Sequence, residues 1–117
     1  MSRTTKEVLE SHYKAFRKGV DAIAADYAED AILMAPNGVH KGRAAIRQFF
    51  IAELAGFPDG FWHALKTIRL DIESDFALFL WQAKPWYPLA ADSFTIRDGQ
   101  IAFQSTSVNI EKDPKPW

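Results

Sequence analysis

Apolar residues recur at helical spacing through the first half of the chain and predict three helices. Thr4 and Glu7 have the spacing of a capping box, which marks the start of a helix that should run to about Lys18. A second, shorter helix should cover residues 20–28. The third should cover residues 43–57, where four apolar side chains form one stripe: Ile46, Phe49, Phe50 and Leu54. Each helix can therefore bury one face against a sheet.

The pattern changes to a period of two in the second half, which predicts strands. A short strand over residues 31–36 comes earlier and ends at the turn Asn37-Gly38. From Trp62 onward, turn signals divide the chain into further strands: up to about residue 73, then 76–84, 89–97 and 101–110. Asp98-Gly99 predicts a tight hairpin between the last two. This order predicts an α+β fold, with three N-terminal helices packed on a curved antiparallel sheet.

Length and composition limit the classes of protein to consider. The 117 residues are enough for a single domain, with an ordered core over about residues 4–110 and a polar tail over 111–117. A net charge of −1 without a basic run argues against nucleic acid or an anionic membrane as a partner. The chain has no cysteine and no apolar run that approaches the length of a membrane span. We therefore expect a soluble, cytoplasmic protein.

An acidic residue falls on the apolar face of a predicted strand. Asp92 alternates in step with Phe94, so both side chains should point the same way. Counting back from an Asp98-Gly99 loop, Asp92 faces Ser105 of the last strand, although a bulge would change this register. The same face would carry Ile101, Phe103, Ser105, Ser107 and Asn109. Burying a carboxylate without a partner costs several kcal/mol or neutralises it, so Asp92 should have a partner or line a pocket.

The first helix carries a second polar residue on its apolar side. At about 100° per residue, His12 lies near the middle of the apolar arc, and Tyr13 lies at its edge. Two ordinary explanations stay open beside a functional one. An inward histidine can be a core residue with a satisfied hydrogen bond, and Asp92 can cap a backbone group or bond a serine. Motifs of metalloproteases, phosphate-binding loops and hydrolase elbows are absent, and the three histidines are scattered, so we expect no metal and no cofactor.

Three stretches carry a resemblance to a known family: DYAEDAILMAPNG, HKGRAAIRQFF and DSFTIRDGQI. Their order and spacing, over about Thr5 to Ile110, resemble the nuclear transport factor 2-like superfamily, and most closely its SnoaL-like and ketosteroid-isomerase-like members. The resemblance implies a cone-shaped, cystatin-like α+β barrel whose bent sheet wraps the first helix around a deep, mostly apolar pocket. It also implies a homodimer, which we expect to form through the outer face of the sheet.

The resemblance also implies roles for individual residues. Asp92 matches an inward aspartic acid that ketosteroid isomerases keep protonated. His12, or Tyr13 if the alignment slips by one, takes the place of a tyrosine that holds an oxyanion. The general base of those isomerases precedes the proline after the first strand, and Ala35 occupies that place here.

These observations support one leading hypothesis and one alternative. The leading hypothesis is a small enzyme that performs acid–base chemistry (isomerisation, cyclisation or dehydration) on an apolar or aromatic small molecule, with His12, Asp92 and Tyr13 as candidate catalytic residues. In it, His12 transfers the proton, and Asp92 faces it across the pocket. The substrate-binding candidates are Phe16, Tyr27, Met34, Trp62, Trp81, Phe94, Phe103, Ser105 and Asn109. The alternative, which Ala35 favours, is a non-catalytic ligand-binding or dimerisation module.

Overall fold

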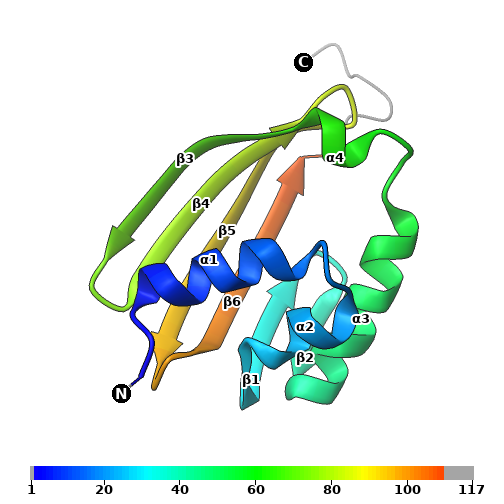
Figure 1. Cartoon of the computed structure of the whole chain (residues 1–117). Helices are drawn as coiled ribbons and strands as arrows, with labels where there is room; N and C mark the ends of the chain where they lie inside the picture. Colours follow the sequence, from blue (N-terminus) through cyan, green and yellow to red (C-terminus); the bar gives the residue numbers. More distant parts are fainter. Residues whose placement is uncertain (1, 110–117) are drawn as a thin grey trace.

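The computed structural model of the chain describes residues 2–109; the predicted tail, residues 111–117, lies outside this range (Figure 1). Helices and strands follow in the order α1 (Thr5–Ala15), α2 (Val20–Ala25), β1 (Tyr27–Ala35), β2 (Gly38–Lys41), α3 (Arg43–Gly56), α4 (Phe61–Ala64), β3 (Leu65–Glu73), β4 (Phe76–Ala83), β5 (Tyr87–Arg97) and β6 (Gln100–Asn109). The six strands form one sheet in the order β2-β1-β6-β5-β4-β3.

The helices cover one face of a strongly curved sheet that does not close into a full barrel (Figure 1). Helix α1 lies across the concave face, while α2 and α3 pack on each other and on β1. This arrangement confirms the predicted α+β fold. None of the helices within residues 2–109 has the length and apolar character needed to cross a membrane.

Several local expectations are confirmed and several are wrong. The capping box is present: Glu7 N donates to Thr4 Oγ1 at 3.1 Å, and Thr4 N donates to Glu7 Oε1 at 2.8 Å. However, β1 pairs with β6 in parallel, so the sheet is mixed rather than antiparallel. The paired residues of these two strands are about seventy positions apart in the sequence, and no hairpin joins the strands directly and forces an antiparallel pairing.

Element boundaries also differ from the expected ones. Helices α1 and α2 end at Ala15 and Ala25, earlier than predicted, and β1 begins at Tyr27. The stretch expected to begin a strand at Trp62 first forms α4, and a short strand, β2, pairs with β1. The expected boundaries rested on local propensity and turn signals, which tertiary contacts can override.

A bulge shifts the register of the last hairpin. Ile96 faces Ile101 as predicted, but the pairing then slips by one residue. Asp92 consequently faces Thr106 rather than Ser105, and Phe94 faces Gln104. A set of residues predicted to share the face of Asp92 therefore lies on the convex, outer face: Phe103, Ser105, Ser107 and Asn109.

Candidate functional site

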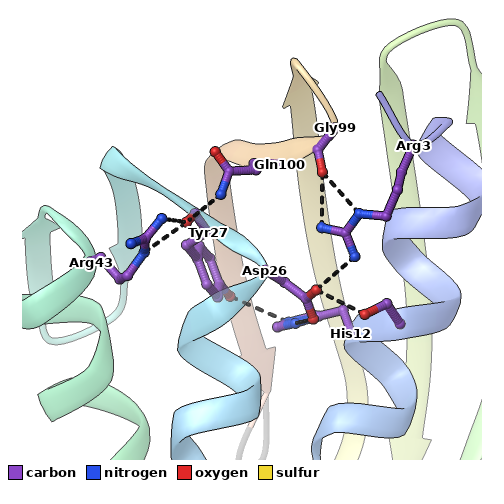
Figure 2. Close-up of polar contacts among 8 residues, drawn as sticks. Arg3, His12, Asp26, Tyr27, Arg43, Gly99 and Gln100 are labelled. Atoms are coloured by element: carbon purple, nitrogen blue, oxygen red, sulfur yellow. Dashed lines mark hydrogen bonds and ion pairs between the residues drawn. The ribbon is translucent and has the colours of Figure 1, made fainter. Parts of the chain in front are cut away.

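His12 is the centre of a buried polar network on the concave side of the sheet (Figure 2). The residue is 5% exposed. Its Nδ1 atom lies 3.4 Å from Oδ2 of Asp26, and its Nε2 atom lies 3.3 Å from the hydroxyl of Tyr27. The Tyr27 hydroxyl also donates to Oε1 of Gln104 on β6. The imidazole therefore sits between a carboxylate and a phenol that come from consecutive residues.

The junction between α2 and β1 creates this arrangement. Asp26 is the C-cap of α2, and Tyr27 is the first residue of β1, so their side chains approach the His12 ring from two directions. The carbonyl of Tyr27 accepts from Nε and Nη2 of Arg43 at 3.0 and 2.8 Å, which fixes the start of the strand (Figure 2).

Asp26 is held as a carboxylate by its neighbours. Its Oδ1 atom accepts from Ser11 Oγ at 2.8 Å and from Arg3 Nη1 at 3.1 Å. Burial alone would raise the pKa of Asp26, but hydrogen bonds from His12, Ser11 and Arg3 outweigh it, and the net pKa lies below the ordinary value. Arg3 also donates to the carbonyl of Gly99, which joins the N-terminal segment to the β5–β6 hairpin (Figure 2).

Two proton arrangements fit the hydrogen bonds of the Tyr27 hydroxyl. When Tyr27 donates to Gln104, both nitrogens of His12 carry protons, and an imidazolium faces the Asp26 carboxylate. When the Gln104 amide is reversed, Gln104 donates to Tyr27, Tyr27 donates to His12, and the imidazole is neutral. The two arrangements differ by one proton and by one rotation of the Gln104 amide.

Aromatic rings fill the space around His12. Phe16, Tyr27, Phe50 and Phe94 present edges or faces to the imidazole, with ring centroids 5.2–6.3 Å away. Two surface depressions lie elsewhere, one beside Asp21 and Arg47 between α2 and α3, the other beside His63 and Lys84. The deep apolar pocket around His12 thus stays a prediction.

Asp92 forms a second polar centre on the concave face. It lies between Phe79 of β4 and Thr106 of β6, and its Oδ2 atom accepts from Trp81 Nε1 at 3.0 Å. Its Oδ1 atom is buried and has no hydrogen-bond partner within residues 2–109. Burial raises the pKa of Asp92, and the nearby Thr106 hydroxyl, the hydrogen bond from Trp81 and the charge of His12 only partly oppose this. Asp92 is therefore a weaker acid than an ordinary aspartic acid.

No hydrogen bond joins His12 to Asp92 within residues 2–109, and the predicted arrangement in which they face each other across a pocket stays a prediction. The carboxylate at His12 belongs to Asp26, and Asp92 is bonded to Trp81 instead. His12 acts on Asp92 only through the electrostatic effect of its charge. The inward directions of both side chains were predicted correctly. However, strand alternation and helical angle do not determine the position of each side chain along the concave face.

The other predicted site residues fall into two groups. Phe16, Tyr27 and Phe94 surround His12, and Trp81 binds Asp92. Trp62 is 51% exposed but lies 5.9 Å from Phe16, measured between ring centroids. Tyr13 is 52% exposed and points away from the concave face, and Met34, Phe103, Ser105 and Asn109 lie on the outer face. Tyr13, Met34, Phe103, Ser105 and Asn109 are therefore separated from both polar centres.

Three residues were not predicted from the sequence: Asp26 and Gln104 of the His12 network, and Glu53 of α3. The bulge hid Gln104, and the early end of α2 hid Asp26. Glu53 carried a usable signal, because it lies on the buried arc of α3 together with Ile46 and Phe50. It is half-buried, and burial followed by the nearby charge of Asp92 raises its pKa.

Comparison with known proteins places this geometry in a family. The sequence profile of the SnoaL-like domain matches residues 9–104. None of the curated proteins matches the chain. A proposed polyketide cyclase from Sinorhizobium meliloti is similar in structure, with 23% sequence identity, a TM-score of 0.69, and coverage of 86% of this chain and 93% of that chain.

Two further solved structures have the same fold. A proposed ketosteroid isomerase from Kribbella flavida is 18% identical, with a TM-score of 0.68 and coverage of 100% of this chain and 87% of that chain. TerC, co-crystallised with polyporic acid, is 14% identical, with a TM-score of 0.68 and coverage of 90% and 91%. Since the profile covers most of the chain, the protein belongs to the SnoaL-like domain family.

Proposed function

We propose that the protein binds an apolar or aromatic small molecule against the concave face of the sheet and performs acid–base chemistry on it, of the isomerase, cyclase or dehydratase kind. One observation carries the proposal: Oδ1 of Asp92 is buried and has no partner within the described residues. A polar atom left unsatisfied in an apolar interior costs about 1–3 kcal/mol, so such an atom calls for an explanation, and a role in binding is one.

A protonated Asp92 is suited to stabilising an oxyanion. Trp81 holds Oδ2 at 3.0 Å, which orients the carboxyl group and leaves Oδ1 free for a ligand oxygen. A neutral carboxylic acid in an apolar site donates a short hydrogen bond to an oxygen as negative charge develops on it. Enolates and phenolates are such oxygens, and both form when a proton leaves an apolar ketone or an aromatic precursor.

His12 has a supporting role in this proposal. Its Nε2 atom contacts the Tyr27 hydroxyl, so a proton that passes between His12 and a ligand uses Tyr27 as the intermediary. Asp26 fixes the ring and balances its charge. The charge of His12 in turn lowers the pKa of Asp92 and thereby adjusts its acidity.

The relatives support the class of ligand and reaction. The similar structures include proteins named as a polyketide cyclase and a ketosteroid isomerase, and TerC was crystallised with polyporic acid. In this chain, the aromatic residues near Asp92 would suit a flat, uncharged molecule: Phe57, Phe61, Trp81 and Tyr87 lie close together at the same end of the sheet.

Two probes test the proposal: a naphthol as an oxyanion mimic, and a β,γ-unsaturated cyclic ketone whose isomerisation is followed by absorbance. We expect Asp92→Asn to weaken naphthol binding and to slow isomerisation on the order of a hundredfold. The matched control is Asp71→Asn, because Asp71 lies on the outer face in an ion pair with Arg69. Equal behaviour of wild type and Asp92→Asn with both probes would contradict the proposal. Binding without turnover would identify the alternative, a non-catalytic ligand-binding module.

We also propose that the protein forms a homodimer through the convex face. No helix within residues 2–109 covers this face, and apolar side chains are exposed on it: Phe76 (60%), Leu89 (49%), Met34 (46%) and Leu78 (38%). Rows of serine and threonine separate them, and such a mixture is typical of subunit interfaces. Light scattering at micromolar concentration should give the mass of a dimer, and Leu78→Lys should give that of a monomer. A monomeric wild-type protein would contradict this part.

A further inference from the structure

We propose that the outer edge of strand β3 pairs with the same edge of a second copy of this chain, in antiparallel orientation and centred on Leu70, so that two sheets join into one. This contact is separate from the proposed acid–base function and from the proposed interface on the convex face. Strand β3 is the last strand of the sheet, on the side away from α2 and α3 (Figure 1). No strand within residues 2–109 pairs with its outer edge.

The length and exposure of this edge are the first argument. Strand β3 has nine residues, whereas β2, the strand at the opposite edge, has four. All residues of β3 after Leu65 are exposed, including three large apolar side chains: Ile68 (49%), Leu70 (46%) and Ile72 (36%). An edge strand presents a row of unpaired N–H and C=O groups, which is a template for another strand. The edge therefore combines main-chain hydrogen-bonding groups with apolar surface.

The order of the charges along β3 is the second argument. The first half of the strand carries two cations, Lys66 and Arg69, and the second half carries two anions, Asp71 and Glu73. Leu70 lies between the two halves. An antiparallel pairing centred on Leu70 places the basic half of each copy opposite the acidic half of the other, whereas a parallel pairing in register would place like charges side by side. The charge order is therefore self-complementary, and it selects both the orientation and a second copy as the partner.

A bulge in β3 places these charged side chains on one face. The pairing with β4 shifts between Thr67 and Arg69, so Lys66 faces Gln82 and Arg69 faces Leu80. Gln82 and Leu80 are two residues apart on β4 and therefore share a face. Without the bulge, Lys66 and Arg69 would lie on opposite faces. The two anions follow Arg69 at intervals of two residues, so all of these charges lie on the convex face.

Opposed residues match in character when the pairing is centred on Leu70. Leu70 faces its own copy, and Arg69 of each copy faces Asp71 of the other. Within one copy, Arg69 Nε already lies 2.6 Å from Asp71 Oδ2, with side chains 67% and 48% exposed. The pairing joins the two ion pairs into a cluster of two arginines and two aspartates in which opposite charges alternate. Because the contact is isologous, each favourable pair occurs twice.

The pairing also extends the concave face of the candidate site. Leu70 faces Phe79, and Phe79 faces Asp92, so these three side chains form one row across the sheet. Directly opposed residues share a face, so Leu70 of the second copy continues this row beyond the edge of β3. The apolar surface that leads from the sheet edge to Asp92 then continues onto the second copy instead of ending in solvent.

The association is weak, because a single pair of edge strands buries less surface than a stable interface. The average mass in sedimentation equilibrium should therefore rise by about half or more between about 10 µM and about 1 mM protein, whatever the mass is at the lower concentration.

Charge reversal tests the register. Arg69→Asp places aspartates opposite Asp71, and Asp71→Arg places arginines opposite Arg69, so the association constant of each variant alone should fall about tenfold. An equimolar mixture of the two variants should associate about as strongly as wild type, because every opposed pair in a mixed dimer has opposite charges. The matched controls are Arg97→Asp and Asp30→Arg, which reverse an exposed ion pair away from β3 and should behave like wild type. Circular dichroism should show that each variant is folded.

Cross-linking tests the orientation, since the chain has no cysteine of its own. At high concentration, a short bismaleimide should link Leu70→Cys to its copy. Lys66→Cys should not be linked, because its two copies would lie eight positions apart along the paired strands, about 26 Å. A parallel pairing in register would link both variants equally, and that result, or no link at Leu70→Cys, would overturn the proposed register.

Three results in sedimentation would overturn the inference. A wild-type mass that does not rise with concentration would show that the charges and the bulge protect the edge from pairing. A rise in mass that charge reversal leaves unchanged would assign the association to another surface. A mixture of Arg69→Asp and Asp71→Arg that associates no better than its components would exclude the opposed charge pairs. None of these results affects the proposed acid–base function, which is tested at Asp92.

Discussion

The Nδ1 atom of His12 lies 3.4 Å from the Oδ2 atom of Asp26, with the two side chains only 7% and 5% exposed. This ion pair explains how a helix can carry an imidazole into an apolar interior. The partner is not Asp92 but the residue directly before β1, and Arg3 and Ser11 complete its hydrogen bonds. Removing Asp26 leaves His12 and Arg3 without their carboxylate, and removing His12 leaves Oδ2 of Asp26 without its neighbour, so stability measurements on either substitution test the pair.

Asp26→Asn should destabilise the protein by about 3 kcal/mol, because it removes the negative charge that faces His12 and Arg3. The free energy of unfolding from urea denaturation measures this effect. Asp21→Asn is the control: Asp21 is 86% exposed and forms an ion pair only with Arg47. Its cost should stay below about 1 kcal/mol. Equal effects of the two substitutions would show that the buried pair contributes nothing.

His12→Phe should also destabilise, by about 2–4 kcal/mol, although the apolar rings around His12 could easily hold a phenyl ring. The cost arises because Oδ2 of Asp26 loses its cation and the Tyr27 hydroxyl keeps only Gln104. Tyr13→Phe, one position along the same helix and on its exposed side, should change the stability by less than about 0.5 kcal/mol. A fully stable His12→Phe variant would identify the imidazole as a space-filling group.

The two buried aspartates should give opposite pH dependences. The pKa of Asp26 is lowered, so its contribution is complete above the ordinary value of 3.8 and is lost as the pH falls through the folded-state pKa. The stability gap between wild type and Asp26→Asn should therefore shrink in acid. The pKa of Asp92 is raised, so its contribution is complete below 3.8 and is lost as the pH rises through the folded-state pKa. Wild type should consequently lose stability relative to Asp92→Asn as the pH rises above 3.8. Urea denaturation over a pH series measures both gaps, and parallel curves would contradict these assignments.

The hairpin that receives Arg3 depends on a glycine. Gly99 has a φ of +73°, and a Cβ atom there would lie 2.8 Å from the backbone nitrogen of Arg3. Gly99→Ala should cost about 1–3 kcal/mol, because it strains the turn and displaces Arg3 from the Gly99 carbonyl. Gly56→Ala is the control, since nothing lies within 4 Å of a Cβ atom at this last residue of α3. Alanine there should leave the stability unchanged or raise it by up to about 1 kcal/mol. Thermal unfolding distinguishes the two, and equal melting temperatures would contradict the prediction.

Features that depend on local periodicity could be predicted from the sequence. The capping box at Thr4 and the inward direction of His12 follow from the geometry of one helix. The inward direction of Asp92 follows from alternation along one strand. Glu53 belongs to the same group, because its helical angle places it among Ile46 and Phe50.

Features that depend on distant parts of the chain could not be predicted in this way. The bulge in the β5–β6 hairpin moved Gln104 to the inner face and Ser105 to the outer face. The parallel pairing of β1 with β6 joins residues about seventy positions apart, and hairpin signals say nothing about such a pair. The partner of His12 depended on the point where α2 ends, which is set by packing rather than by propensity.

The most direct test of the proposed function is the titration of the Asp92 carboxyl carbon by NMR, with its signal identified by its loss in Asp92→Asn. The proposed oxyanion site requires that Asp92 keep its proton where an ordinary aspartic acid has lost it. The titration midpoint should therefore lie above 3.8, and bound naphthol should raise it further, because a phenolate favours a protonated neighbour. A midpoint at or below 3.8, unchanged by naphthol, would show that Asp92 is an ordinary carboxylate and would contradict its role as the acid of this site.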